Sequence, residues 1–170
     1  MVDKFVPNDA SSDKWVMVLP FDLQLVTNKV SDFEIPGLSI DGTIGPRAGN
    51  SATMFQISGD TVSFDPSTFT FVVDEDYTNY IAVAKRMLET PYKDTSDVVM
   101  DIEISLLNNR GSSKSGVVIK YIGARFVNLS SVSLDTNAQV KTLACTVTFQ
   151  FQDMEMYKGG KLVLSSQQTV

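Results

Sequence analysis

Histidine is absent from this chain of 170 residues, and cysteine occurs once, at Cys145. Without histidine the chain lacks the commonest general base, the usual serine and cysteine triads, and most zinc and copper sites. A single cysteine excludes an internal disulfide. Because Cys145 shares one side of an alternating segment with Leu143 and Val147, we interpret it as a small buried side chain. The sequence therefore predicts no enzyme, no metal site and no cofactor.

Basic residues are scarcer than acidic ones, 14 against 20, and the net charge is −6. Lys85-Arg86 is the only pair of adjacent basic residues. Since affinity for phosphate comes from clustered Lys and Arg, a DNA-reading protein is disfavoured, whereas DNA could pass along such a surface without specific binding. No apolar run approaches the roughly 20 residues of a membrane span, and the start lacks the pattern of a signal peptide. We expect a protein made in the cytoplasm, without a membrane anchor.

Alternation of apolar and polar residues dominates the chain and predicts seven or eight strands. They fall at 15–26, 30–35, 54–57, 62–73, 98–107, 117–126, 129–134 and 142–152. One segment, 77–88, changes to steps of three and four residues and predicts an amphipathic helix, with the acidic residues 74–76 at its start and Pro91 at its end. The fold class is therefore mostly β with one helix, a β-sandwich or barrel.

Three parts of the chain differ in composition. Residues 1–14 are polar and rich in turn formers and predict an N-terminal arm. Residues 15–157 carry the alternating pattern and form one β domain. Residues 158–170, which begin with Lys158-Gly159-Gly160, predict a C-terminal extension that forms a second arm.

A long connection over 36–53 contains two prolines and several glycines, yet apolar residues recur in it. Long loops in compact domains are usually functional or disordered, and the apolar residues argue against simple disorder. We expect this loop to become ordered against a partner surface. Its candidate contact residues are Leu38, Ile40, Ile44 and Arg47.

The polar side of the last strand is uncharged. Thr146, Thr148, Gln150 and Gln152 all form hydrogen bonds without carrying charge. An exposed strand of a lone monomer more often carries charge, especially lysine, because charge prevents edge pairing. This face therefore favours a sheet that closes into a larger barrel with neighbouring subunits. An ordinary solvent-exposed strand is the alternative interpretation.

The order of these segments resembles the tail tube protein family of contractile-tailed bacteriophages. The resemblance covers about residues 21–157: a strand at 21–25, Ile35-Pro36-Gly37 with a long loop, a β-run at 69–73 leading into a helix at 80–88, then the segments 119–126, 134–137 and 145–151. It implies a β-sandwich or barrel with one flanking helix. It also implies hexameric rings whose strands join into a continuous inner barrel, and which stack into a tube that conducts DNA.

By this resemblance the loop over 36–53 would reach an adjacent ring or subunit, and the Thr/Gln face would line the lumen. The protein would be a structural component of the virion tail, with copies of itself, the tail sheath and the baseplate as partners. The arm before residue 15 and the extension after residue 157 depart from the family pattern. They leave open an initiator or terminator ring at a tube end. A secretion-system tube protein and, more remotely, a monomeric ligand-binding β-barrel remain as further alternatives.

Overall fold

The structure is a computed structural model, and it describes residues 13–44, 56–107, 116–134 and 142–166. Ten strands and three α-helices lie within these ranges, together with two short 3-10 helices. In chain order the elements are β1 (Trp15–Val18), η1 (Phe21–Leu23), α1 (Gln24–Thr27), β2 (Val30–Glu34), β3 (Leu38–Ile44), β4 (Gln56–Phe64), β5 (Ser67–Val72), α2 (Thr78–Glu89), η2 (Thr90–Tyr92), α3 (Thr95–Val98), β6 (Met100–Leu106), β7 (Val117–Leu129), β8 (Ala144–Gln150), β9 (Asp153–Lys158) and β10 (Lys161–Ser165).

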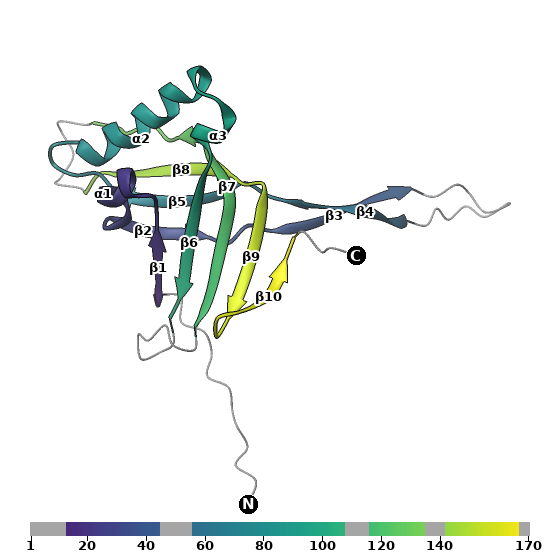
Figure 1. The fold of residues 1–170 in the computed structure, drawn as a ribbon. Helices are drawn as coiled ribbons and strands as arrows, with labels where there is room; N and C mark the ends of the chain where they lie inside the picture. The colour runs from purple at the N-terminus through teal and green to yellow at the C-terminus, as the bar shows by residue number, and fades with distance from the viewer. Residues whose placement is uncertain (1–12, 45–55, 108–115, 135–141, 167–170) are drawn as a thin grey trace, which may run out of the picture.

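Two layers of antiparallel strands share the long strand β7. The layer that we call sheet A has the order β1-β6-β7-β9-β10, and the layer that we call sheet B has the order β7-β8-β5-β2. The first half of β7, Val117 to Ile122, pairs with β9, whereas the second half, Arg125 to Leu129, pairs with β8. The strands of the two layers run crosswise (Figure 1), as in sandwiches whose corners are formed by a strand that changes sheets.

Gly123 forms the corner at which β7 passes from sheet A to sheet B. Its φ angle is 64°, in the left-handed region that glycine adopts without a Cβ penalty. A Cβ at this position would lie 2.6 Å from Oε1 of Gln152. The amide of Gly123 donates to Oδ1 of Asp101 (3.2 Å), and the amide of Gln152 donates to the carbonyl of Ile122 (3.0 Å). The bend is therefore bonded on both sides and closed to a larger residue.

The core lies between the two layers and is rich in aromatic side chains. The ring of Tyr121 lies 5.6 Å from that of Phe149 and 4.8 Å from that of Phe151, and Phe69 lies 5.9 Å from Phe126. Burial raises the pKa of Tyr121, so its hydroxyl stays neutral. Cys145 is buried in this core, as its place in the alternation predicts.

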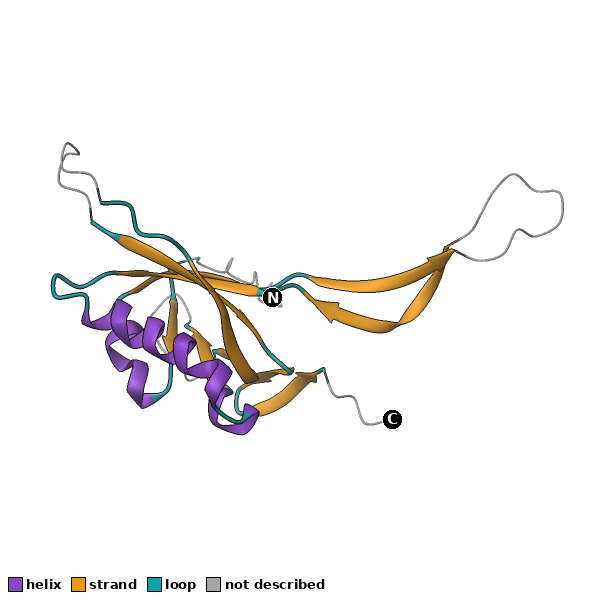
Figure 2. Cartoon of the chain, turned by 90° about the horizontal axis from the view of Figure 1, so that it is seen from above, coloured by secondary structure: helices purple, strands orange, loops and turns teal. Residues whose placement is uncertain are grey.

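Helix α2 covers one end of the sandwich (Figures 1 and 2). Its inward face buries Val83 and Asn79. The side-chain amide of Asn79 donates to the carbonyl of Val72 (2.8 Å) and its oxygen accepts from the amide of Asp74 (3.1 Å), so Asn79 ties the helix to the end of β5. Hydrogen bonds from Thr78, first from its side chain and then from its amide, hold the pKa of Asp76 below its usual range. The predicted helix and an acidic group at its start are confirmed.

The predicted strand over 15–26 is wrong beyond residue 18. Residues 21–27 form η1 and α1, so the segment 21–25 quoted for the family resemblance is helical. Leu23 and Val26 are buried whereas Leu25 is 51% exposed. Burial here follows a step of three residues, and the alternation of Leu23 with Leu25 suggested a strand by coincidence.

Further elements differ from the prediction. Within the described ranges three α-helices are present where one was predicted, the strand predicted over 62–73 is divided between β4 and β5, and β9 was not predicted. Residues 38–44 belong to a strand, β3, paired with β4, so much of the expected loop over 36–53 forms an arm of a β-hairpin. No separate strand occupies 129–134, because β7 continues to Leu129. The extension at 158–170 is not simply an arm, because β10 pairs with β9 and extends sheet A.

Candidate assembly surfaces

The outer face of sheet B is uncharged at its centre. Thr146 and Thr148 on β8 lie directly opposite Thr70 and Thr68 on β5, and all four side chains are half-buried. The hydroxyls of Thr70 and Thr146 are 2.9 Å apart and share a hydrogen bond. Neighbouring threonines therefore satisfy some of their hydrogen-bonding capacity on the sheet itself.

Gln150 belongs to this face as well, and Gln152 does not. Gln150 is exposed and accepts a hydrogen bond from the guanidinium of Arg125 (3.5 Å). Gln152 follows the end of β8, and its side chain lies over the bend at Gly123. Three of the four residues predicted to line a lumen therefore share one surface.

Charged residues mark the two edges of sheet B. Asp32 and Glu34 project from β2 at one edge, since they pair across from Thr70 and Thr68. Arg125 stands at the other edge, in the second half of β7, opposite Gln150. All three side chains are exposed. The sequence prediction missed them because β2 and β7 are far apart in the sequence, and only strand order reveals that opposite charges stand at opposite edges.

Both edges of sheet B are open within the described ranges of the chain. β2 pairs with β5 alone, and the register of β6 on β7 ends at Ala124, so Arg125 to Leu129 pair with β8 alone. Sheet B has four strands of alternating direction, so its two edge strands run antiparallel. Copies placed side by side would therefore bring β2 of one copy antiparallel to β7 of the next, the more favourable pairing.

The hairpin of β3 and β4 projects away from the sandwich (Figures 1 and 2). One face of it carries Leu38, Ile40 and Val62, which are 60%, 60% and 53% exposed. They share this face because Ile40 pairs with Val62, and Leu38 pairs with Phe64. Leu38 and Ile40 are therefore exposed, and their predicted contact with a neighbouring subunit or ring stays a prediction. The side chain of Ile44, and Arg47 entirely, lie outside the described residues.

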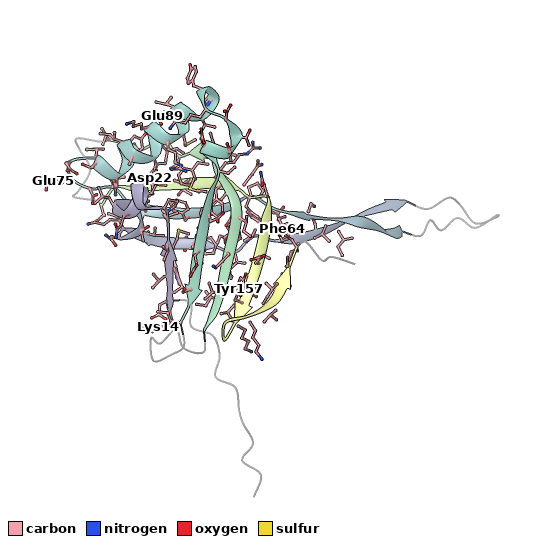
Figure 3. The ribbon with its side chains drawn as sticks, in the orientation of Figure 1. Lys14, Asp22, Phe64, Glu75, Glu89 and Tyr157 are labelled. Atoms are coloured by element: carbon pink, nitrogen blue, oxygen red, sulfur yellow. The ribbon has the colours of Figure 1, made fainter. Side chains whose placement is uncertain are left out.

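The outer face of sheet A is charged, in contrast to that of sheet B. Lys120 at its centre forms an ion pair with Glu103 (3.5 Å), and its ammonium lies 5.5 Å from the centre of the Tyr157 ring. The hydroxyl of Tyr157 donates to Glu155 (2.6 Å), which raises the pKa of the tyrosine. Figure 3 places Tyr157 on this layer, near the end of β9.

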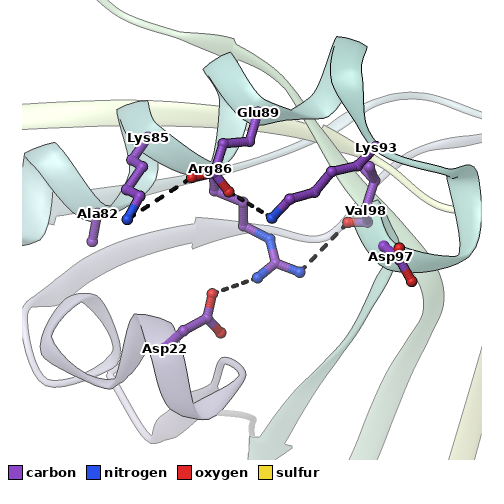
Figure 4. Close-up of a pocket in the computed structure, with 8 residues that line it drawn as sticks. All are labelled: Asp22, Ala82, Lys85, Arg86, Glu89, Lys93, Asp97 and Val98. Atoms are coloured by element: carbon purple, nitrogen blue, oxygen red, sulfur yellow. Dashed lines mark hydrogen bonds and ion pairs between the residues drawn. The ribbon is translucent and has the colours of Figure 1, made fainter.

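A cavity of about 320 Å³ lies beneath α2, and ion pairs surround it (Figure 4). Arg86 crosses it and forms an ion pair with Asp22 of η1, while its guanidinium also donates to the carbonyl of Val98 (3.5 Å). Glu89 forms an ion pair with Lys93, and this contact lowers the pKa of Glu89. These contacts therefore join α2 to η1, to α3 and to the residue that follows η2.

Two kinds of feature, a cluster of metal ligands and a membrane-spanning helix, are absent from the described residues. They include no group of three metal-ligating His, Cys, Asp or Glu side chains. Within the same ranges, no helix combines the length and apolarity that a membrane crossing requires.

Comparison with known proteins shows which solved structures share the fold. No protein-family model and no curated protein matches the sequence. Among solved structures, one similar chain comes from the anti-feeding prophage baseplate, with a TM-score of 0.67, 14% identity, and coverage of 91% of this chain and 99% of that chain. A chain of the anti-feeding prophage tube-terminating cap has a TM-score of 0.59, 15% identity, and coverage of 90% and 93%. A chain of the extracellular contractile injection system PVC, in its sheath-tube complex, has a TM-score of 0.55, 19% identity, and coverage of 90% and 94%.

The fold is that of contractile-tail tube proteins and their tube-end relatives. The resemblance stated from the sequence is thus confirmed at the level of the fold, although one of its segments, 21–25, is helical. The mostly-β fold class is confirmed as well. The similar chains come from structural assemblies, which agrees with the prediction of a non-enzymatic protein.

Proposed function

We propose that this protein is a structural subunit that assembles into rings, and that the rings stack into the tube of a contractile tail. The observation that carries the proposal is sheet B, with its uncharged outer face and two open antiparallel edges of opposite charge. Side-by-side copies would pair β2 with the second half of β7, and the joined sheets would line a channel with threonine and glutamine side chains. Six copies per ring is the expected number, since the similar baseplate structure is described as 6-fold symmetrised.

Ring closure would bring Glu34 and Asp32 of one copy beside Arg125 of the next. Exchanging the charge tests this contact. We expect Arg125→Glu to abolish rings in native mass spectrometry and negative-stain micrographs, because acidic side chains would then face each other across the joint. The double variant Arg125→Glu with Glu34→Arg is expected to restore rings.

Lys120→Glu is the matched control, because Lys120 is also a cation on a strand, half-exposed, but lies on sheet A. It is expected to leave ring formation intact. Rings that survive Arg125→Glu, or a double variant that fails to restore them while remaining folded, would contradict this mode of closure. A wild-type chain that stays monomeric at high concentration would contradict the proposed function as a whole.

The channel would hold its contents weakly. Hydroxyl and amide side chains offer no positive charge for phosphate. We propose that the cargo is DNA, which passes without specific binding. We also propose that the tube belongs to a phage tail within the virion. Sheath and baseplate proteins would be the partners of this protein. DNA retained by assembled wild-type tubes as tightly as by tubes of Thr148→Lys, measured by fluorescence anisotropy at low salt, would contradict a non-binding lumen.

A ring at a tube end is the second candidate. It is favoured by the TM-scores of 0.67 and 0.59 with chains from a baseplate and a tube-terminating cap, against 0.55 for the sheath-tube complex. The distinction is measurable in purified tails: a repeating subunit is present in many copies along the tube, whereas an end ring is present once per tail. An injection-system tube that carries proteins would be distinguished by the contents of the purified particles.

A further inference from the structure

Sheet A also has two open edges, and ring closure through sheet B leaves both of them unused. Among the described strands, β1 pairs with β6 alone and β10 pairs with β9 alone. They lie at opposite ends of sheet A (Figure 1). An open edge presents unpaired backbone donors and acceptors, which a partner strand can satisfy.

Both edge strands have few of the features that prevent pairing. β1 contains no charged residue and no proline, and its Val16 and Val18 are 46% and 48% exposed. β10 has one charge, Lys161 at its first residue, and its next three residues Leu162, Val163 and Leu164 are 53%, 64% and 42% exposed. An edge that stays in water usually carries lysine or proline within the strand; β10 instead shows only an irregular register near Val163.

A groove accompanies the edge of β1. It has a volume of about 450 Å³, and residues of both β1 and β2 line it, among them Trp15, Val16, Met17, Val30, Ser31 and Asp32. The groove leaves room beside β1 for a further extended segment.

The direction in which these edges face follows from the crosswise layers. This step rests on the proposed function: if the edges of sheet B close the ring, then the order of strands in sheet A runs along the tube. The edge of β10 then faces one neighbouring ring, and the edge of β1 faces the other. The hairpin of β3 and β4 projects on the same side of the molecule as β10 (Figure 1).

Strand direction fixes the kind of pairing. Sheet A has five strands, each antiparallel to its neighbour, so β1 and β10 run parallel to each other. A contact that repeats by translation from ring to ring would therefore be a parallel pair. It would join two different surfaces and remain open at both ends, as growth of a tube requires.

Continuity of the side-chain rows supports this partner. Val16, Ser105, Val118, Tyr157 and Leu162 are directly paired in succession across the five strands, so they form one row on the outer face of sheet A. A β10 edge placed against the β1 edge of another copy would continue this row and bring Leu162 close to Val16. We propose that β10 of a subunit in one ring pairs, in parallel, with β1 of a subunit in the next ring.

Disulfide trapping tests the contact directly. In a Cys145→Ala background, which removes the native thiol, Val16→Cys and Leu162→Cys are combined and the assembled protein is oxidised. On non-reducing gels we expect a ladder of covalently linked subunits that extends to more subunits than one ring holds. Either cysteine alone is expected to give only monomer. Dimers from Leu162→Cys alone would indicate a two-fold pair of β10 strands and would overturn the proposal, as would tubes that form without any covalent ladder.

A charge at the edge provides the second measurement. Val163→Lys is expected to leave the rings, which close through sheet B, intact in native mass spectrometry. It is expected to shorten the tubes at least tenfold in micrographs. Tyr92→Lys is the matched control, since Tyr92 is 89% exposed and lies beyond α2; its tubes are expected to keep their length. Val163→Lys tubes of normal length, or loss of the rings themselves, would overturn the inter-ring role of β10. Failure of the wild-type chain to form rings would instead contradict the proposed function, on which the inter-ring contact rests.

Discussion

Sheets A and B share β7 and one core, yet their outer faces and edges differ. Sheet B has four strands, a centre of threonines and edges of opposite charge, whereas sheet A has five strands and a charged pair, Lys120 and Glu103, at its centre. An even number of alternating strands gives antiparallel edges, so copies joined through sheet B would pair antiparallel. An odd number gives parallel edges, so copies joined through sheet A would pair in parallel. The comparison teaches that the two layers of one chain offer two kinds of open edge, which we propose serve self-association in two directions.

The largest effect is expected in the core that both sheets share. Phe149 is fully buried and contacts Tyr121 of sheet A across the core and Phe69 of the neighbouring strand β5 within sheet B. Phe149→Ala should lower the free energy of unfolding by about 3–5 kcal/mol, because it leaves a cavity between the sheets. Urea denaturation measures this loss. Tyr92→Ala, at an exposed position, should change the free energy by less than about 0.5 kcal/mol.

Gly123 joins the two sheets, and Gly123→Ala should have the next largest effect. The left-handed conformation alone costs an alanine about 1–2 kcal/mol, and the contact with Gln152 adds to it. Gly159→Ala is the matched control, since its φ is 58° and nothing lies within 4 Å of the added Cβ. Equal losses of stability for the two variants in urea denaturation would show that the corner is not closed as the structure indicates.

Smaller losses of stability, one independent of salt and one dependent on it, should distinguish the two outer faces. Thr146→Val on sheet B removes the hydrogen bond to Thr70 and should cost about 0.5–1.5 kcal/mol at any salt concentration. Lys120→Met on sheet A removes an exposed ion pair with Glu103 and should cost less than about 1 kcal/mol, with the loss fading at high salt. Thermal unfolding at low and high ionic strength checks both. A salt-dependent loss for Thr146→Val would break the comparison.

The smallest effect concerns pH and belongs to sheet A alone. The pKa of Tyr157 is raised by its hydrogen bond to Glu155, so the folded state retains the proton longer than the unfolded chain. Its contribution to stability is therefore complete below the unfolded pKa of about 10 and is lost as the pH rises through the folded value. Tyr157→Phe should reduce the loss of stability above about pH 10. An unchanged alkaline slope in this variant would argue against the bond to Glu155.

The regular strands and α2 could be predicted from the sequence, because their burial follows a clear period. The alternation of Cys145, Val147 and Phe149 matches β8, and the steps between Tyr80 and Leu88 match α2. Residues 21–27 misled the prediction because Leu23 and Leu25 alternate although only Leu23 is buried. Short alternating segments do not distinguish a helical turn from a strand.

The candidate site was only partly predictable. The uncharged side of β8 is visible in the sequence because Thr146, Thr148 and Gln150 lie two residues apart. The opposite charges of Arg125 and Glu34 were not predictable, since they are distant in sequence and only the order of strands places them at opposite edges. Sheet A's final edge was missed for another reason: Lys158-Gly159-Gly160 suggested the start of an arm, but Gly159 and Gly160 form the turn between β9 and β10.

A cryo-electron-microscopy reconstruction of the assembled wild-type protein tests the central claim most directly. Our account predicts a ring whose inner wall is one continuous antiparallel sheet, with β2 of each copy against the second half of β7 of its neighbour and with Thr146 and Thr148 facing the channel. A ring lined by the Lys120 face of sheet A, or one in which the sheets of neighbouring copies do not join, would contradict it.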